Sequence, residues 1–200
     1  MDPNVVINRL VRLAKLDTTV FDEVRDDANE LIPALVITVV SALLAGLGAL
    51  LFWSVVASGT PDRVFVNQVI FGSIFMAVMY GVAALVVYVV MVQMFKVQVE
   101  LQALVRTMGY ASFPLAACIL MFIPILWPVF AIVPLALLLV TTIYAVQSAT
   151  SAQSNQVVIA SLIGFAVFVL VLGVIATTSD SGKAPMGAGL FGIISDWNFG

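Results

Sequence analysis

Three long stretches of this chain contain no Asp, Glu, Lys or Arg, and they constrain its fold more than any other feature. They cover residues 31–61, 64–95 and 107–179. A helix needs about 20 apolar residues to cross the hydrocarbon core of a bilayer. Charged residues make up only 10% of the chain and hydrophobic residues 62%, so a soluble surface cannot be built. The sequence therefore predicts an integral membrane protein.

The charge-free stretches divide into five predicted spans. The third stretch is too long for one crossing, and it is expected to break near the prolines at 124 and 128 and at the polar run 147–156. The third span is short, so spans three and four form a short hairpin that either crosses the bilayer or is re-entrant. The predicted fold is an all-α polytopic membrane protein with spans at 31–57, 69–95, 111–123, 128–144 and 157–178.

Three segments are expected: a cytoplasmic N-terminal segment (1–30), a five-helix membrane domain (31–178) and an exoplasmic tail (179–200). The N-terminal segment begins as a helix, since Asp2 can cap it and Pro3 suits its first turn. This helix is amphipathic, and we interpret it either as an interfacial anchor or as a partner-binding helix. Its apolar residues are Val6, Ile7, Leu10, Val11, Leu13 and Ala14, opposite Arg9, Arg12 and Lys15.

The distribution of Lys and Arg predicts the orientation, because cytoplasmic loops carry an excess of both. Six of these residues precede span one or follow span two, whereas only Arg63 and Lys183 fall on the other side. The N-terminus is therefore expected in the cytoplasm and the C-terminus outside.

The segment after span two is expected to continue as a surface helix that Gly109 ends. Its charged residues Lys96, Glu100 and Arg106 are interpreted as solvated anchors. Within the spans, small residues recur at four-residue spacing, which favours close packing of helices. These pairs are Ala42 and Gly46, Ala45 and Ala49, Ala77 and Gly81, and Ala160 and Gly164.

The C-terminal tail changes from a flexible composition to an aromatic one. Phe191, Ile194, Trp197 and Phe199 are apolar side chains that water solvates poorly. We expect them either to anchor the tail at the membrane surface or to dock it against another subunit.

Composition also restricts the chemistry. The chain has no histidine and a single cysteine, Cys118, so the commonest metal ligand and general base is missing. The spans hold no ionisable carboxylate or cation for proton coupling, and a net charge of −3 without a basic run argues against nucleic acid. We expect no enzyme activity, no catalytic or metal-binding residue and no cofactor. Bound lipid, and apolar contact with a partner's pigment or quinone, remain compatible with this composition.

Two local patterns carry a family resemblance. TVFDEVRDD lies at 19–27, directly before span one, and ELQALVRTMGYASFPLA lies at 100–116. Together with five spans, they resemble the Yip-domain family of Ypt/Rab-interacting membrane proteins over about residues 10–178. The matched positions are Thr19, Phe21, Val24, Arg25, Leu104, Arg106, Gly109, Tyr110, Ala111 and Pro114.

The resemblance implies a five-helix bundle with a cytoplasmic N-terminus. Eukaryotic relatives are associated with Rab GTPases and with vesicle and Golgi membranes. This chain lacks their long N-terminal region and their D-L-Y-G-P motif, so it is similar to prokaryotic members, which implies a prokaryotic inner or plasma membrane.

The matched residues also have physical interpretations. Gly109 allows close approach of helices, and Pro114 suits the first turn of span three. Tyr110 is expected at the interface with its hydroxyl in water, and Phe21 beneath the loop at the inner leaflet. Arg25 and Arg106 are expected to pair with Asp26, Asp27, Glu30 or lipid phosphate.

The sequence favours a non-catalytic accessory or scaffold subunit that packs against a larger membrane complex. A protein that organises membrane shape or trafficking is one alternative. A channel or transporter for a small neutral solute, lined by Tyr80, Tyr88 and Thr141, is another.

Overall fold

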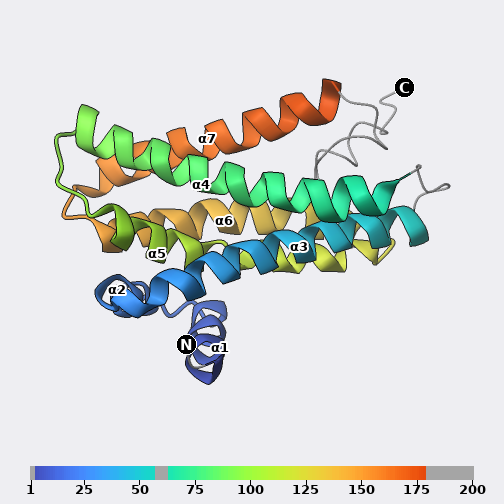
Figure 1. Ribbon diagram of the computed structural model, residues 1–200, viewed down its shortest axis with the longest axis horizontal. Coiled ribbons are helices and arrows are strands. Elements are labelled where there is room, and N and C mark those ends of the chain that lie inside the picture. Colours follow the sequence, from blue (N-terminus) through green and yellow to red (C-terminus); the bar gives the residue numbers. More distant parts are fainter. Residues whose placement is uncertain (1–2, 57–62, 179–200) are drawn as a thin grey trace. The chain divides into compact units, whose positions relative to one another are not determined.

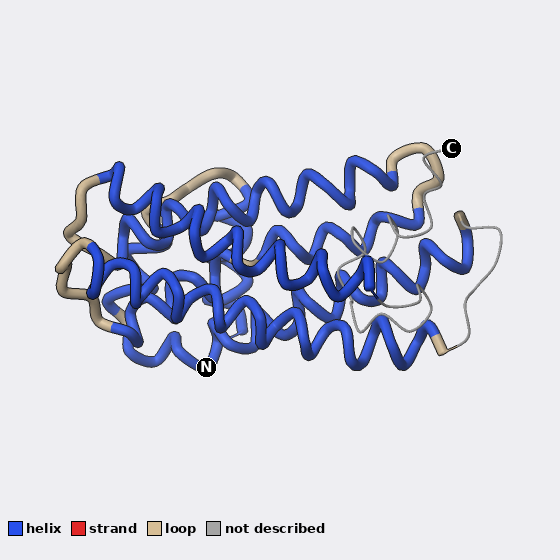
Figure 2. Tube along the Cα trace, turned by 90° about the horizontal axis from the view of Figure 1, so that it is seen from above, coloured by secondary structure: helices blue, strands red, loops and turns tan. Residues whose placement is uncertain are grey.

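A computed structural model describes residues 3–56 and 63–178. Within these residues the regular structure is helical, and β structure is limited to an isolated bridge between Val99 and Thr150 (Figures 1 and 2). The α-helices are α1 (Pro3–Ala14), α2 (Val20–Asp26), α3 (Leu31–Val55), α4 (Ser73–Val89), α5 (Leu101–Ala111), α6 (Trp127–Ala149) and α7 (Ser154–Thr178). The 3₁₀ helices are η1 (Ala28–Glu30) and η4 (Phe113–Phe122), and the π-helices are η2 (Phe65–Gly72) and η3 (Val90–Met94).

Five helical segments of the described chain are long and apolar enough to cross a membrane, which confirms the predicted fold class. The polar run 147–156 separates α6 from α7, as expected. The five segments are Ala28–Val55, Phe65–Met94, Leu101–Phe122, Trp127–Ala149 and Ser154–Ile175.

Two predictions about the third segment are wrong. Span two does not continue as a surface helix, because the chain turns at Lys96, whose φ of 57° is left-handed and ends a helix. The residues assigned to that surface helix instead form α5, and α5 passes through Gly109 without a break. Eleven α-helical and ten 3₁₀ residues together rise about 36 Å, enough for a crossing.

The chain divides into two compact units, and each long helix contributes to both. The first unit holds Met1–Thr38, Gly81–Phe113 and Leu138–Phe165, and the second holds Val39–Tyr80, Pro114–Leu137 and Ala166–Gly200. In the first unit α2 packs on α5. In the second unit the ring of Phe52 lies 5.2 Å from that of Trp127, and Tyr80 meets Phe168 edge to face at 5.9 Å.

Glycines set how closely neighbouring helices approach within each unit. A Cβ atom added at Gly109 would lie 2.6 Å from the Cβ of Ala34, and one at Gly164 would lie 2.6 Å from Val87, both in the first unit. In the second unit, a Cβ at Gly46 would lie 2.4 Å from Ser73 Oγ. Ala42, Ala45, Ala49 and Ala160, which belong to the predicted small-residue pairs, are also buried.

The pair Ala77 and Gly81 on α4 behaves differently from the other three. Among the described residues, nothing lies within 4 Å of a Cβ placed at Gly81, and this position is exposed. The spacing therefore predicts internal packing correctly for three pairs and wrongly for this one.

Candidate functional site

Figure 1 shows α1 and α2 beside the beginning of α3. Several polar side chains of these segments and of α5 are bonded to one another. We call Arg9, Arg25, Glu30, Arg106 and Tyr110 the polar junction. They come from α1, α2, η1 and α5 and form two bonded groups: Arg9, Glu30 and Tyr110 in one, and Arg25 and Arg106 in the other. Glu30 and Arg106 are buried, and a low local dielectric strengthens the bonds of buried groups.

Glu30 is the centre of the polar junction. It is 7% exposed and directly precedes α3, where the helix dipole stabilises a carboxylate. Its Oε1 accepts a hydrogen bond from Arg9 Nη1, and its Oε2 accepts one from the Tyr110 hydroxyl at 2.6 Å. Both carboxylate oxygens therefore have a donor, as a buried charge requires.

Acidic residues from the segment after α1 surround its arginines. Arg9 Nε lies 3.5 Å from Glu23, and Arg12 lies 2.7 Å from Glu23 and 2.8 Å from Asp17. Hydrogen bonds from Thr19, and then from Arg12, lower the pKa of the Asp17 carboxyl from its usual value. These contacts fix α1 against the turn that leads to α2.

Arg25 joins α2 to the end of α6. Its guanidinium donates to both carboxylate oxygens of Asp26, at 2.7 and 2.9 Å, and to the carbonyl oxygen of Ser148 at 2.9 Å. The bond from Arg25 lowers the pKa of the Asp26 carboxyl. A planar guanidinium suits such bidentate pairing, which lysine could not reproduce.

Arg106 joins α5 to α2 through the backbone. Its Nη2 donates to the carbonyl oxygen of Arg25 at 2.6 Å, and the residue is only 4% exposed. Its ionic partner Glu100, at 3.8 Å, has a side chain that is 66% exposed. The interpretation of Arg106 as a solvated anchor is therefore wrong, because α5 packs against α2 and removes this side chain from solvent.

Apolar contacts lie beneath these bonds. Phe21 and Val24 of α2 are at most 1% exposed, as is Leu104 of α5. Gly109 brings α5 against the backbone of Ala34 in α3. Polar bonds and a packed apolar layer therefore both hold α2 in place.

The structure brings together five of the predicted site residues: Phe21, Arg25, Arg106, Gly109 and Tyr110. Two expectations for them are wrong. The hydroxyl of Tyr110 is bonded to Glu30 rather than to water, and Phe21 lies inside the protein instead of in the leaflet. Arg25 does pair with Asp26, as expected.

The remaining predicted residues lie elsewhere. Pro114 is buried in the first turns of η4. The C-terminal candidates Phe191, Ile194, Trp197 and Phe199 lie outside the described residues.

The sequence did not indicate Arg9 as a member of the site, and Glu30, expected to pair with Arg25 or Arg106, instead bonds Arg9 and Tyr110. A signal was available, since Glu30 is the last acidic residue before the first charge-free stretch. A carboxylate at that position must reach water or find a cation, but the sequence does not show which cation.

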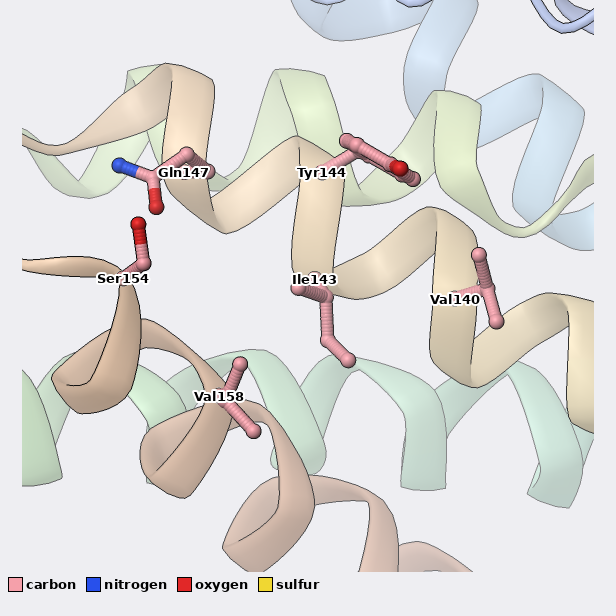
Figure 3. A pocket seen from close by; sticks show the side chains of 6 residues that line it. All are labelled: Val140, Ile143, Tyr144, Gln147, Ser154 and Val158. Carbon is pink, nitrogen blue, oxygen red and sulfur yellow. The ribbon is translucent and has the colours of Figure 1, made fainter.

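An open groove of about 360 Å³ lies along α6 and the start of α7 in the first unit. Figure 3 shows Gln147 and Ser154 facing each other at one end, with Ile143 and Val158 further along. No charged side chain lines this groove, whose residues are Val140, Ile143, Tyr144, Gln147, Ser154 and Val158. Across the described residues, no cluster of His, Cys, Asp or Glu could hold a metal ion.

A comparison with known protein families covers most of the same residues. A family model described as the Yip1 domain matches residues 18–176. Searches of curated proteins and of solved structures find no match. The matched range includes α2, all five candidate spans and every residue of the polar junction except Arg9. This chain is therefore a multi-pass membrane protein that belongs to the Yip1 domain family.

Proposed function

We propose that this protein is a non-catalytic accessory or scaffold subunit that packs against a larger membrane protein complex. The observation that carries the proposal is the small-residue pair Ala77 and Gly81 on α4, which does not pack against another helix of the chain at Gly81. Three such pairs pack inside the chain, whereas Gly81 meets nothing within 4 Å among the described residues. Small residues let transmembrane helices approach closely, so this face suits a helix of another subunit.

The surroundings of Gly81 support the same use. Large apolar side chains continue the face along α4 at spacings of three and four residues, and each is at least half exposed. They are Ile74, Val78, Leu85 and Val89. Such a face offers an apolar seam with a small residue in its middle, which a partner helix can approach closely.

The polar junction supports a structural role for its own residues. Glu30 uses both carboxylate oxygens within the chain, and Arg25 and Arg106 are likewise bonded internally. Bonds of this kind hold helices in position, and we assign these residues no catalytic step.

The test is co-purification of the tagged full chain from its native membrane in mild detergent, followed by mass spectrometry. We expect a stoichiometric set of subunits with the natural protein and loss of that set with Gly81→Leu. A Cβ added at Gly81 meets nothing within 4 Å among the described residues, so the change should not disturb the chain's own packing. Ala136→Leu, at an exposed small residue of α6, is the matched control and should keep the set. Purification of the natural protein alone, or retention of the set by Gly81→Leu, would contradict the proposal.

The groove along α6 and α7 favours a second candidate, passage or binding of a small neutral solute. Its lining is uncharged, and its volume is near the lower limit of small-molecule sites. Tyr80, Tyr88 and Thr141, the lining expected from the sequence, are not among the groove residues, and Thr141 donates to Ala111. Loss of solute flux in vesicles with Gln147→Leu, without loss of co-purifying subunits, would favour this candidate.

The membrane-organising alternative rests on family analogy alone, and we place it third.

A further inference from the structure

The sequence pattern groups the apolar residues of α1 on one face, but the structure buries some of them and exposes others. Val6 and Leu13 are 7% and 5% exposed, so they pack on the protein itself. Arg9 lies on the same side, where it pairs with Glu30. The apolar residues on another side are left uncovered, since Ile7 is 59% and Val11 44% exposed.

Helical spacing places these uncovered residues in one stripe. Ile7, Val11 and Ala14 are separated by four and three residues, so they share a face of the helix. Leu10 lies beside them and is half-buried. The stripe is distinct from the inward side, because Val6 and Leu13 lie more than a quarter turn away from Ile7 at about 100° per residue.

The position of α1 is fixed relative to the first span. Arg9 bonds Glu30, and Glu30 belongs to the candidate span Ala28–Val55, near its beginning. Figure 1 shows α1 lying across α3 rather than along it. A helix that lies across a span, rather than along it, is oriented as an in-plane membrane helix would be.

The charged residues of α1 indicate which kind of partner the stripe suits. Residues 3–16 contain no acidic residue. Arg9 and Arg12 are engaged by acids of the following segment, while Lys15, among the described residues, forms no ion pair. An apolar stripe with one available cation and no anion is complementary to a leaflet that contains anionic phospholipid.

We propose that α1 is an in-plane membrane helix whose Ile7–Val11–Ala14 stripe enters the acyl boundary of the leaflet while Arg9 fastens its other side to Glu30. The occupant of the stripe is phospholipid, and Lys15 lies at the phosphate level. The proposal is independent of the accessory role, because it requires no partner subunit.

Fluorescence quenching in vesicles tests this directly. The full chain with Cys118→Ala would carry Ile7→Cys, Val11→Cys or Ala14→Cys, each labelled with an environment-sensitive dye. Asn8→Cys is the matched control, since Asn8 is exposed on the same turn but lies about 100° from Ile7. The labelled proteins are reconstituted in phosphatidylcholine vesicles with a minority of phosphatidylglycerol and with lipids that carry a shallow acyl-chain quencher.

We expect several-fold stronger lipid quenching at positions 7, 11 and 14 than at position 8, and the reverse order with aqueous iodide. Equal, weak lipid quenching at all four positions would overturn the proposal and leave the stripe for a protein partner. The positions are exposed, so labelling should leave the thermal midpoint unchanged, and three independent stripe positions keep the result decisive if one variant misfolds.

Discussion

Gly109 decides how closely α5 can approach α3. A methyl group at this position would lie 2.6 Å from the Cβ of Ala34 and 2.8 Å from its carbonyl oxygen. Backbone atoms cannot move aside as a flexible side chain can, so any larger residue must push the two helices apart. The neighbouring Tyr110 depends on this approach, since its hydroxyl reaches Glu30 at the start of α3.

Gly109→Ala is therefore expected to lower the free energy of unfolding by about 1–3 kcal/mol through overpacking. Denaturant or thermal unfolding in detergent measures the change. Gly81→Ala is the matched control, because it makes the same chemical change where nothing lies within 4 Å. There, stability should stay unchanged or rise by up to about 1 kcal/mol from the higher helix propensity of alanine. Equal destabilisation at both positions would disprove the close-approach explanation.

At the scale of elements, α2 is held at its last turn by two arginine contacts that both involve Arg25. Arg106 reaches its last turn from α5, and Arg25 of α2 itself reaches the carbonyl oxygen of Ser148 in α6. A helix of seven residues is too short to be stable by itself, so these contacts and the burial of Phe21 keep it folded. The loss of one contact should therefore destabilise the helix throughout residues 20–26.

Arg106→Met removes the donor to the Arg25 carbonyl while keeping an unbranched side chain. We expect a loss of about 1–3 kcal/mol, because a part-buried carbonyl oxygen loses its bond to a charged donor. Hydrogen exchange should show the loss of protection at residues 20–26. Glu100→Gln, which removes only the exposed ionic partner of Arg106 at 3.8 Å, should change stability by less than about 0.5 kcal/mol. Unchanged exchange at α2 in the Arg106 variant would refute the contact's role.

The stability of α2 is also expected to depend on pH. Hydrogen bonds from Arg25 lower the pKa of Asp26 from its ordinary value of 3.8, so the carboxylate form is favoured in the folded protein. The stability from this pair is present above the unfolded pKa and is lost as the pH falls through the lower folded pKa. The protection factors at residues 20–26, which compare exchange with its slower intrinsic rate in acid, should therefore fall as the pH is lowered. Asp26→Asn should remove the Asp26 contribution to this step, and an unaltered acid profile in that variant would count against the pairing.

At the scale of the whole molecule, the N-terminal helix is an addition to the family domain. The Yip1 match begins at residue 18, yet Glu30 within that match takes one of its two hydrogen bonds from Arg9 in α1. Removing one partner of a buried ion pair is more harmful than removing both, because the remaining charge is left uncompensated. We therefore expect the stability of the matched domain to depend on a residue outside the matched range.

This dependence can be measured with a double-mutant cycle. Arg9→Met should destabilise the protein by about 1–3 kcal/mol, less than for a fully buried pair, because Arg9 also keeps some contact with solvent. Adding Glu30→Gln to that variant should restore part of the loss, since the amide carries no charge. The pair is monitored by thermal unfolding in detergent. If the two losses simply add, Arg9 and Glu30 do not act together in the folded protein.

The sequence by itself determined the all-α membrane fold, the number of candidate spans and the family resemblance. These follow from charge-free length and short motifs, because lipid admits helices whose backbone bonds are internal. Three of the small-residue pairs were also predicted correctly as packing sites, since their spacing is a property of the helix alone.

Only the tertiary structure decided which residues meet. Arg9 and Glu30 are 21 positions apart, and Tyr110 is 80 from Glu30. No local pattern encodes such a meeting, which depends on how α1, α3 and α5 pack. The same packing buried Arg106 and Tyr110, turned Val6 and Leu13 inward, and left Ile7, Val11 and Gly81 uncovered. Periodicity shows that a helix has faces, but the neighbours of each face are set by the assembled fold.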